Sequence, residues 1–210
     1  LEALAEADSP VIKLDTEVKE MDYIDAFVGS DTRTAGYVCG QDLLENKPDG
    51  GMIVIVESSS VNSVNERITG FEEAIANGGF EVIQRIDAGG DVSVVKPALT
   101  ELLQSGEQID GIMCGDDQMA EQVLAALDEA GNTDPLVYSV DGSPATKTAL
   151  TDPDSPMQGV GAQSPINMGK TAVKVASAVL EGGAFSRENY EETFFIGRDN
   201  VEMYGTDGWQ

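Results

Sequence analysis

Two adjacent carboxylates, Asp116 and Asp117, stand between the apolar stretch IDGIMCG and the amphipathic stretch QMAEQVLAALDEAG. Three kinds of chemistry suit such a pair: accepting charge-assisted hydrogen bonds from the hydroxyl groups of a polyol, binding Mg²⁺ or Ca²⁺ through oxygen, and general acid and base catalysis. An aspartate at a helix start also caps the helix, which stabilises it by about 0.5–2 kcal/mol relative to alanine. Capping accounts for one of the two carboxylates, and the second requires another role.

Polar side chains also stand where other predicted strands end. In a parallel α/β sheet the carboxyl ends of the strands meet at one edge, and ligands bind in the crevice beyond that edge. The sequence therefore predicts a polar ligand site there. Its candidate residues are Asp15, Asp31, Ser58, Ser59, Ser60, Asp116, Asp117, Asp141 and Gln163.

Several catalytic arrangements are excluded by the composition. The chain has no histidine, so neither Ser143 in VDGSP nor a cysteine has a histidine base. The two cysteines, Cys39 and Cys114, are too few for a zinc site, and we expect buried thiols rather than a disulfide. Neither GxGxxG nor GxxxxGK(S/T) occurs, so no phosphate cradle is predicted. No nucleophile–base pair of a hydrolase or transferase is therefore recognisable in the chain.

The charge balance is strongly acidic, because 38 Asp and Glu face 12 Lys and Arg and give a formal charge of −26. Nucleic-acid affinity comes mainly from Lys and Arg that displace counterions, so we expect no nucleic-acid partner. No stretch approaches the roughly 18 consecutive apolar residues of a membrane-spanning helix. The first stretch, LEALAEADSP, has no basic segment followed by an apolar one, so it shows no secretion signal.

Apolar strands and amphipathic helices alternate along the chain, which is the pattern of right-handed βαβ units on parallel sheets. After an initial helix at 1–7, strands are expected at 10–15, 25–31, 50–59, 80–88, 109–117, 135–142, 157–163 and 189–199. Helices are expected at 34–47, 64–79, 92–106, 118–131, 143–151 and 164–183. The predicted fold class is α/β.

Seven stretches, in this order, are similar to the type I periplasmic sugar-binding proteins of the ribose-binding-protein class: PVIKLD, FVGSDTRTAGYVCGQDLL, NERITGFEEAI, DGIMCGDDQMA, YSVDGSP, VGAQSPINMGKTAV and FIGRDNV. The resemblance implies two Rossmann-like lobes with parallel sheets, joined by a three-stranded hinge. The matched stretches do not include about the first third of the family's chain, so the N-terminal lobe is expected to be incomplete. That lobe would comprise residues 1–31 with 164–182, and the C-terminal lobe residues 32–163 with 183–210.

The resemblance also implies roles for five residues. Asp15 and Asp141 match acceptors for sugar hydroxyl groups, Arg67 matches a donor to sugar oxygens, and Gln163 matches an amide near the hinge. Asp116 falls where many members have asparagine. Chemistry agrees with these roles, because a ligand that lacks one hydroxyl group leaves a buried polar group unpaired. We therefore expect a ligand site made of these residues.

The chain departs from the family pattern in the same site. Thr16 stands where ribose binders have arginine, Gly90 falls at a position that is often aromatic, and Asp116 replaces the common asparagine. The predicted site then contains three acidic residues and mainly one basic residue, Arg67. We therefore do not expect ribose as the ligand, and the alternatives are another sugar, a polyol or an amine-bearing compound.

The function that the resemblance implies is the substrate-binding component of an ABC-type sugar importer, which binds a monosaccharide or related polyol and presents it to a membrane permease. Such a protein is a binding protein and not an enzyme, so we expect no catalytic residue, no cofactor and no bound metal. It would act in the periplasm or outside the cell, with a lipid anchor as one option. A sheet as small as that of the incomplete lobe is marginally stable alone. We therefore expect either a homodimer through residues 1–31, or a further segment that proteolysis removed or that was deliberately left out. The alternative is the effector-binding domain of a lac-repressor-family transcription regulator, which shares the fold; the charge of −26 argues against it.

Overall fold

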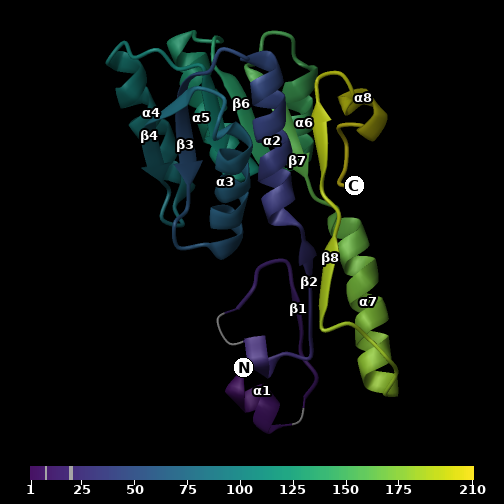
Figure 1. The fold of residues 1–210 in the computed structure, drawn as a ribbon. Coiled ribbons are helices and arrows are strands. Elements are labelled where there is room, and N and C mark those ends of the chain that lie inside the picture. Colours follow the sequence, from purple (N-terminus) through teal and green to yellow (C-terminus); the bar gives the residue numbers. More distant parts are fainter. Residues whose placement is uncertain (8, 19–20) are drawn as a thin grey trace.

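The computed structural model describes residues 1–7, 9–18 and 21–210, and its strands form two separate sheets (Figure 1). The smaller sheet has the order β1-β2-β8, with β1 at Ile12–Leu14, β2 at Ala26–Ser30 and β8 at Glu188–Glu191. The larger sheet has the order β4-β3-β5-β6-β7-β9, with strands at Phe80–Asp87, Gly51–Glu57, Gly111–Cys114, Leu136–Asp141, Met157–Ala162 and Phe194–Gly197. Within the described residues, β7 and β9 pair antiparallel and the other neighbours pair parallel. The predicted α/β class is confirmed.

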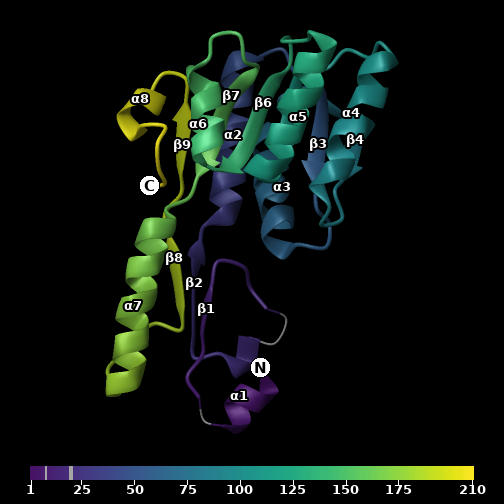
Figure 2. The same ribbon diagram turned by 180° about the vertical axis from the view of Figure 1, so that it is seen from behind.

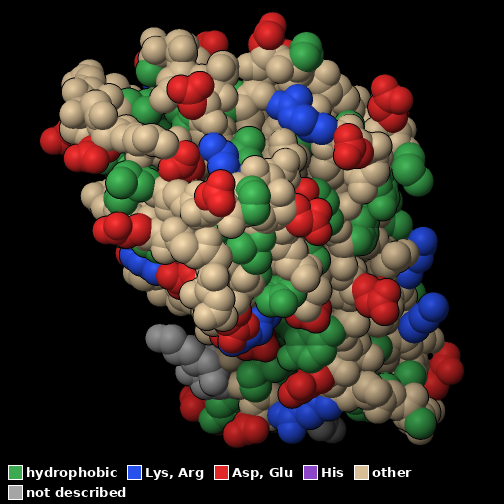
Figure 3. Space-filling model, turned by 45° about the horizontal axis from the view of Figure 1, so that its top comes forward, with side chains coloured by type: hydrophobic (Ala, Val, Ile, Leu, Met, Phe, Trp, Pro, Cys, Tyr) green, Lys and Arg blue, Asp and Glu red, His purple; other side chains and the backbone are tan. Residues whose placement is uncertain are grey.

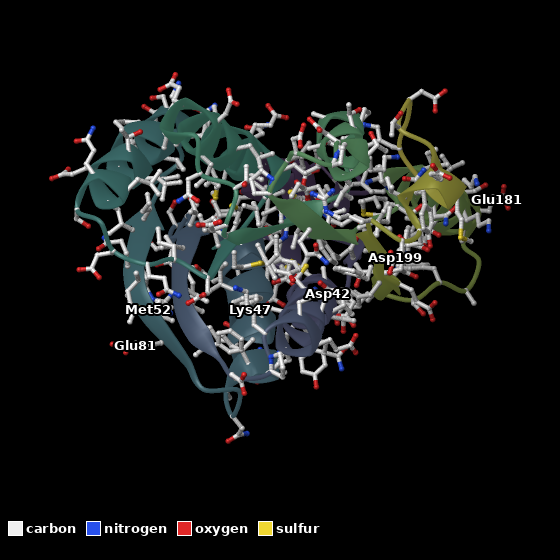
Figure 4. The ribbon with its side chains drawn as sticks, turned by 90° about the horizontal axis from the view of Figure 1, so that it is seen from above. Asp42, Lys47, Met52, Glu81, Glu181 and Asp199 are labelled. Carbon is white, nitrogen blue, oxygen red and sulfur yellow. The ribbon has the colours of Figure 1, made fainter. Side chains whose placement is uncertain are left out.

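Helices cover both faces of the larger sheet, as the view along it in Figure 4 shows. One face carries α2 (Thr32–Asn46) and α3 (Asn62–Ile75), and the other carries α4 (Val95–Gln104), α5 (Asp117–Ala130) and α6 (Pro144–Thr151). Side chains of β3 alternate between the two cores: Ile53 and Ile55 pack on the α2 and α3 side, and Val54 and Val56 on the α4 and α5 side. Burial on both faces explains why this strand reads as a continuous apolar run.

Two glycines let α3 lie against α2, and this contact positions Arg67. A Cβ atom on Gly36 of α2 would stand 1.8 Å from the carbonyl oxygen of Arg67. A Cβ atom on Gly70 of α3 would stand 1.9 Å from the carbonyl oxygen of Arg33. Any larger residue at either position would push the helices apart. The close contact between α2 and α3 therefore fixes the position of the Arg67 backbone relative to the larger sheet.

The smaller lobe consists of the three-stranded sheet and α7 (Pro165–Glu181), which lies beside β8 in Figures 1 and 2. Its core is small: Met168 and Val175 of α7 pack against Ala26 and Val28 of β2. The short helix α1 (Glu2–Glu6) and the 3₁₀ turn η1 (Met21–Tyr23) complete this lobe. Helix α8 (Val201–Tyr204) and the turn η2 (Val92–Val94) belong to the larger lobe, where each packs against its helices and strands.

Three segments cross between the lobes, from β2 to α2, from β7 to α7 and from β8 to β9 (Figures 1 and 2). The last crossing corrects the sequence prediction, because the single strand expected at 189–199 is two strands in different sheets. Strand β8 pairs with β2 and β9 pairs with β7. The expectation that residues 183–210 all return to the C-terminal lobe is thus wrong for β8. The stretch NYEETFFIGRD contains no glycine or proline at the break, so its pattern gives no boundary.

The thiols of Cys39 and Cys114 are both free and buried, as expected. Burial raises the pKa of each thiol above its ordinary value, which keeps both groups neutral. Acidic side chains are spread over the face shown in Figure 3, among fewer basic ones. Among the described helices, none is both long and apolar enough to cross a membrane.

Candidate functional site

Arg67, Asp141 and Gln163 form one connected polar cluster at the carboxyl edge of the larger sheet. The Arg67 guanidinium, whose residue is 5% exposed, lies with Nη2 3.1 Å from Asp141 Oδ1. Its Nη1 donates to the carbonyl oxygen of Gly115 at 2.8 Å. Gln163 Nε2 donates to the same Asp141 Oδ1 at 2.5 Å. Three of the five predicted site residues are therefore in direct contact.

The backbone holds Asp141 in an unusual conformation at the end of β6. Its φ is +133°, in the region that side chains other than glycine seldom adopt, and Gly142 follows with φ +88°. The carbonyl oxygen of Asp141 accepts a hydrogen bond from the backbone nitrogen of Gln163 at 2.9 Å. The turn thus directs the carboxylate toward Arg67, and its geometry is coupled to the crossing into α7.

Burial raises the pKa of Asp141 to about 7. The Arg67 charge opposes this effect, the carboxylates of Asp117 and Asp116 add to it, and the hydrogen bond from Gln163 opposes it. The direction of the shift means that burial and neighbouring negative charge outweigh the single guanidinium. Asp141 therefore binds its proton more tightly than an exposed aspartate does.

The adjacent carboxylates at the start of α5 have different roles. Asp116 is the N-cap, and its Oδ1 accepts from the backbone nitrogen of Met119 at 2.8 Å. Asp117 is 3% exposed. It accepts from four donors of β6, the following turn and the first turn of α6: Ser139 Oγ, the backbone nitrogens of Gly142 and Ser143, and Thr146 Oγ1. Asp117 therefore braces the turn that carries Asp141, and Asp116 keeps one carboxylate oxygen for the site.

Asp15 lies on the smaller lobe, just after β1, with φ +67°. It lines a cavity of about 50 Å³ between the lobes, together with Phe27 of β2, Asn62 and Ser63 of α3, and Tyr190 of β8. No hydrogen bond among the described residues joins Asp15 to the Arg67 cluster. The structure thus places four predicted residues at the edge of the larger sheet and the fifth on the opposing lobe.

The sequence analysis missed Glu17, Asn62 and Tyr190, of which Glu17 and Asn62 touch across the two lobes. Asn62 Nδ2 of α3 donates to Glu17 Oε2 at 3.3 Å, and the Tyr190 hydroxyl donates to Glu17 Oε1 at 3.4 Å. All three residues also line a cavity of about 470 Å³. Glu17 stands two residues beyond Asp15, which is the only sequence signal for it; Tyr190 lies 173 residues away along the chain.

Three buried polar atoms among the described residues have no hydrogen-bond partner: Arg67 Nε, Gln163 Oε1 and Ser58 Oγ. Ser58 follows β3 and Gln163 follows β7 at the carboxyl edge of the larger sheet, and Arg67 of α3 reaches the same edge through Asp141. Buried polar groups are nearly always paired, so orphaned atoms in a polar cluster mark a place where a ligand or water binds. Arg67 offers a donor there and Gln163 an acceptor.

Two further observations limit what the site can be. The described residues contain no group of three or more His, Cys, Asp or Glu side chains placed to hold a metal ion. A separate cavity of about 370 Å³ lies between the C-terminal ends of α5 and α6, with Leu124, Leu127 and Pro156 in its lining. This cavity contains none of the five predicted residues, so the cluster of Arg67, Asp141 and Gln163 is the better candidate for a ligand site.

Comparisons with known proteins agree with this architecture. The chain matches the periplasmic binding protein domain over residues 1–184. The ribose import binding protein of Salmonella typhimurium is 28% identical over 178 residues, which cover 84% of this chain and 59% of that protein. The D-allose-binding periplasmic protein of Escherichia coli (strain K12) is 27% identical over 168 residues, which cover 78% of this chain and 53% of that protein. The chain thus spans between half and three fifths of the length of these curated relatives.

Solved structures show the same fold. An ABC transporter solute binding protein from Bacillus halodurans C-125 with bound myo-inositol has a TM-score of 0.87 at 25% identity, over 97% of this chain and 71% of that one. A periplasmic solute binding protein from Actinobacillus succinogenes 130z with bound D-allose has a TM-score of 0.88 at 22% identity, over 97% of this chain and 74% of that one. With two parallel sheets joined by three crossings, the chain has the type I periplasmic binding protein fold and belongs to the periplasmic binding protein domain family.

Proposed function

We propose that this chain is the substrate-binding component of an ABC-type sugar importer and binds a monosaccharide or related polyol between its two lobes. The observation that carries the proposal is the cluster of Arg67, Asp141 and Gln163, in which a buried donor and a buried acceptor have no partner. A polyol offers hydroxyl groups that both accept and donate, so it satisfies the two orphaned atoms at once. The proposed ligand-binding residues are these three together with Asp15 and Asp116.

The site binds and does not catalyse in this proposal. A carboxylate in contact with a guanidinium recognises adjacent hydroxyl groups, and the relatives named above are binding proteins. Their names refer to ribose and D-allose, and the solved relatives hold myo-inositol or D-allose. A small polyhydroxylated ring is the common feature, and the importer role follows from the same names.

Ligand binding shifts the protein toward a closed arrangement of the lobes. Asp15 and Glu17 lie on the smaller lobe, whereas Arg67 and Asn62 lie on the larger one. A ligand that touches both sides stabilises the closed state by its differential affinity, with the three crossings acting as the hinge. A membrane permease then recognises the closed state, and the protein acts in the periplasm or outside the cell.

A homodimer through the smaller lobe is a separate part of the proposal. Strand β1 is an edge strand of a three-stranded sheet whose buried core is small. An exposed strand edge pairs readily with another chain. A second copy adding to β1 would extend the sheet and bury its edge.

Native mass spectrometry of the purified chain with a panel of pentoses, hexoses and cyclic polyols tests these proposals together, because one spectrum reports subunit number and bound ligand. We expect a saturable adduct with the mass of one panel compound per chain, and a dimer as the main species. A chain that binds no compound of the panel contradicts the sugar-binding function. A monomer at micromolar concentration contradicts the dimer and leaves the ligand site standing.

A further inference from the structure

The positively charged group of the site, the Arg67 guanidinium, already contacts other groups of the protein. Arg67 contacts Asp141 through Nη2 and the Gly115 carbonyl oxygen through Nη1, and its buried Nε has no protein partner. Asp116 stands at the same sheet edge, and its charge acts on Asp141. The opposing lobe contributes Asp15 and Glu17. A ligand between the lobes therefore meets carboxylates on both sides and the partly engaged guanidinium of Arg67, while Arg33 in the lining of the neighbouring cavity is already paired with Glu66 and Glu73.

Several acceptor oxygens of the cluster also lack a hydrogen-bond donor from the protein. Gln163 Oε1 is a buried acceptor without a donor. Asp116 uses Oδ1 for Met119, and Asp141 uses Oδ1 for Arg67 and Gln163. No donor from the described residues reaches Oδ2 of either aspartate. The site thus offers three acceptor oxygens that no described donor reaches, and two of them belong to carboxylates.

A neutral polyol can pair with these atoms but brings no positive charge to the two carboxylates. Each of its hydroxyl groups donates one neutral hydrogen bond to a carboxylate oxygen. An ammonium group has three donors and no acceptor. Its hydrogen bonds to carboxylates are charge-assisted and about twice as strong as neutral ones.

We propose that the ligand is a polyol that carries a protonated amino group, with the ammonium among the free oxygens of Asp116, Asp141 and Gln163 and a ring hydroxyl at Arg67 Nε. This inference rests on the proposed function, since it names the ligand class of that same site. The raised pKa of Asp141 agrees with it, because an added cation favours the ionised carboxylate that the buried site otherwise disfavours. The class comprises amino sugars and amino-substituted cyclitols.

Calorimetric titration of the 210-residue chain with matched compounds tests the inference. The probes are D-glucosamine with D-glucose, D-galactosamine with D-galactose, and an inosamine with myo-inositol, each amine also in its uncharged N-acetyl form. We expect at least one amine to bind about tenfold or more tightly than its hydroxyl and N-acetyl counterparts, as a charge-assisted bond predicts. Neutral compounds that bind as tightly as the amines overturn the inference and leave sugar binding in place. Absence of binding by every compound overturns the sugar-binding function as well.

An Asp116→Asn variant localises the effect. Asparagine caps a helix about as well as aspartate, so α5 keeps its first turn while Oδ2 is replaced by a donor. We expect the amine preference of this variant, measured as the ratio of the two dissociation constants, to fall to about twofold or less. The control is Asp199→Asn at an exposed position of the larger lobe (Figure 4), which should leave the preference unchanged. An undiminished preference in Asp116→Asn contradicts the assigned position of the ammonium.

Discussion

Adjacent residues of the same type have unlike roles here, and Asp116 and Asp117 show this best. Both read as candidate ligand groups at the end of a strand. In the structure, Asp117 is buried and accepts from four protein donors, whereas Asp116 caps α5 and keeps a free oxygen. Burial decides the role, because a buried carboxylate must satisfy its lone pairs within the protein.

The two aspartates should differ in what they contribute to stability. Asp117→Ala leaves four donors of β6, the following turn and α6 without their acceptor, and we expect it to lower the free energy of unfolding by about 3 kcal/mol or more. Asp116→Ala removes one capping bond and should cost about 1 kcal/mol. Urea unfolding of both variants measures the difference. Equal losses in the two variants would show that the Asp117 contacts do not brace the turn.

Asp141 should make stability depend on pH. Its pKa in the folded protein is raised to about 7 by burial, above that of an exposed aspartate, so the folded state binds the proton more tightly than the unfolded chain. Its contribution is therefore fully present at low pH and is lost as pH rises through about 7.

The variant Asp141→Asn removes this titrating group. Its free energy of unfolding, relative to the unmodified chain, should rise between about pH 5 and pH 8, measured by urea unfolding at each pH. The control is Asp134→Asn, an exposed aspartate outside the site, whose difference from the unmodified chain should stay level. A flat difference for Asp141→Asn would mean that Arg67 holds the carboxylate ionised throughout this range.

At the scale of elements, the sequence predicted the alternation of strands and helices because the two-sided burial of parallel strands leaves a clear apolar pattern. It did not predict the break between β8 and β9, because that break comes from strand pairing in two sheets and not from a turn residue. The Arg67, Asp141 and Gln163 positions were predictable from the resemblance. The Glu17 contacts were not, since the one with Asn62 depends on how the lobes face one another and the one with Tyr190 depends on the pairing of β8 with β2.

The C-terminal segment is an element that only the structure connects to the site. Lys147 of α6 is buried and donates through Nζ to the Gly208 carbonyl oxygen at 2.6 Å and to Gln210 Oε1 at 2.7 Å. Ser164, the N-cap of α7 beside Gln163, donates to the Gln210 carbonyl oxygen at 2.7 Å. The C-terminal end accordingly lies at the junction of the lobes in Figures 1 and 2.

Lys147→Met should release this segment, because methionine fills similar space but donates no hydrogen bond. We expect faster amide hydrogen exchange in residues 205–210 and in the first turn of α7, with exchange in α3 unchanged. Lys96→Met is the matched control, since it removes a surface ion pair with Glu129. Unchanged exchange in residues 205–210 would show that Lys147 does not hold the segment.

At the scale of the whole molecule, the formal charge of −26 sets the balance of forces. Charges of one sign repel across the surface, and this self-repulsion destabilises the compact state. Salt screens it, since the Debye length falls from about 10 Å at 0.1 M to about 3 Å at 1 M. We expect the midpoint of thermal unfolding to rise as sodium chloride increases over this range. A midpoint that falls with salt would show that the ion pairs outweigh the repulsion.

The most direct test of the ligand site is calorimetric titration of the tightest-binding compound into the unmodified chain, Arg67→Met and Arg85→Met. Arg85 is the matched control because its guanidinium pairs with Glu57 and Glu72 on the surface, outside the site. Loss of a hydrogen bond from a charged group costs about 1.5–3 kcal/mol. The account predicts that Arg67→Met weakens binding by about tenfold to a hundredfold and that Arg85→Met leaves it within about twofold. Equal affinity in Arg67→Met and the unmodified chain would contradict the assignment of the site.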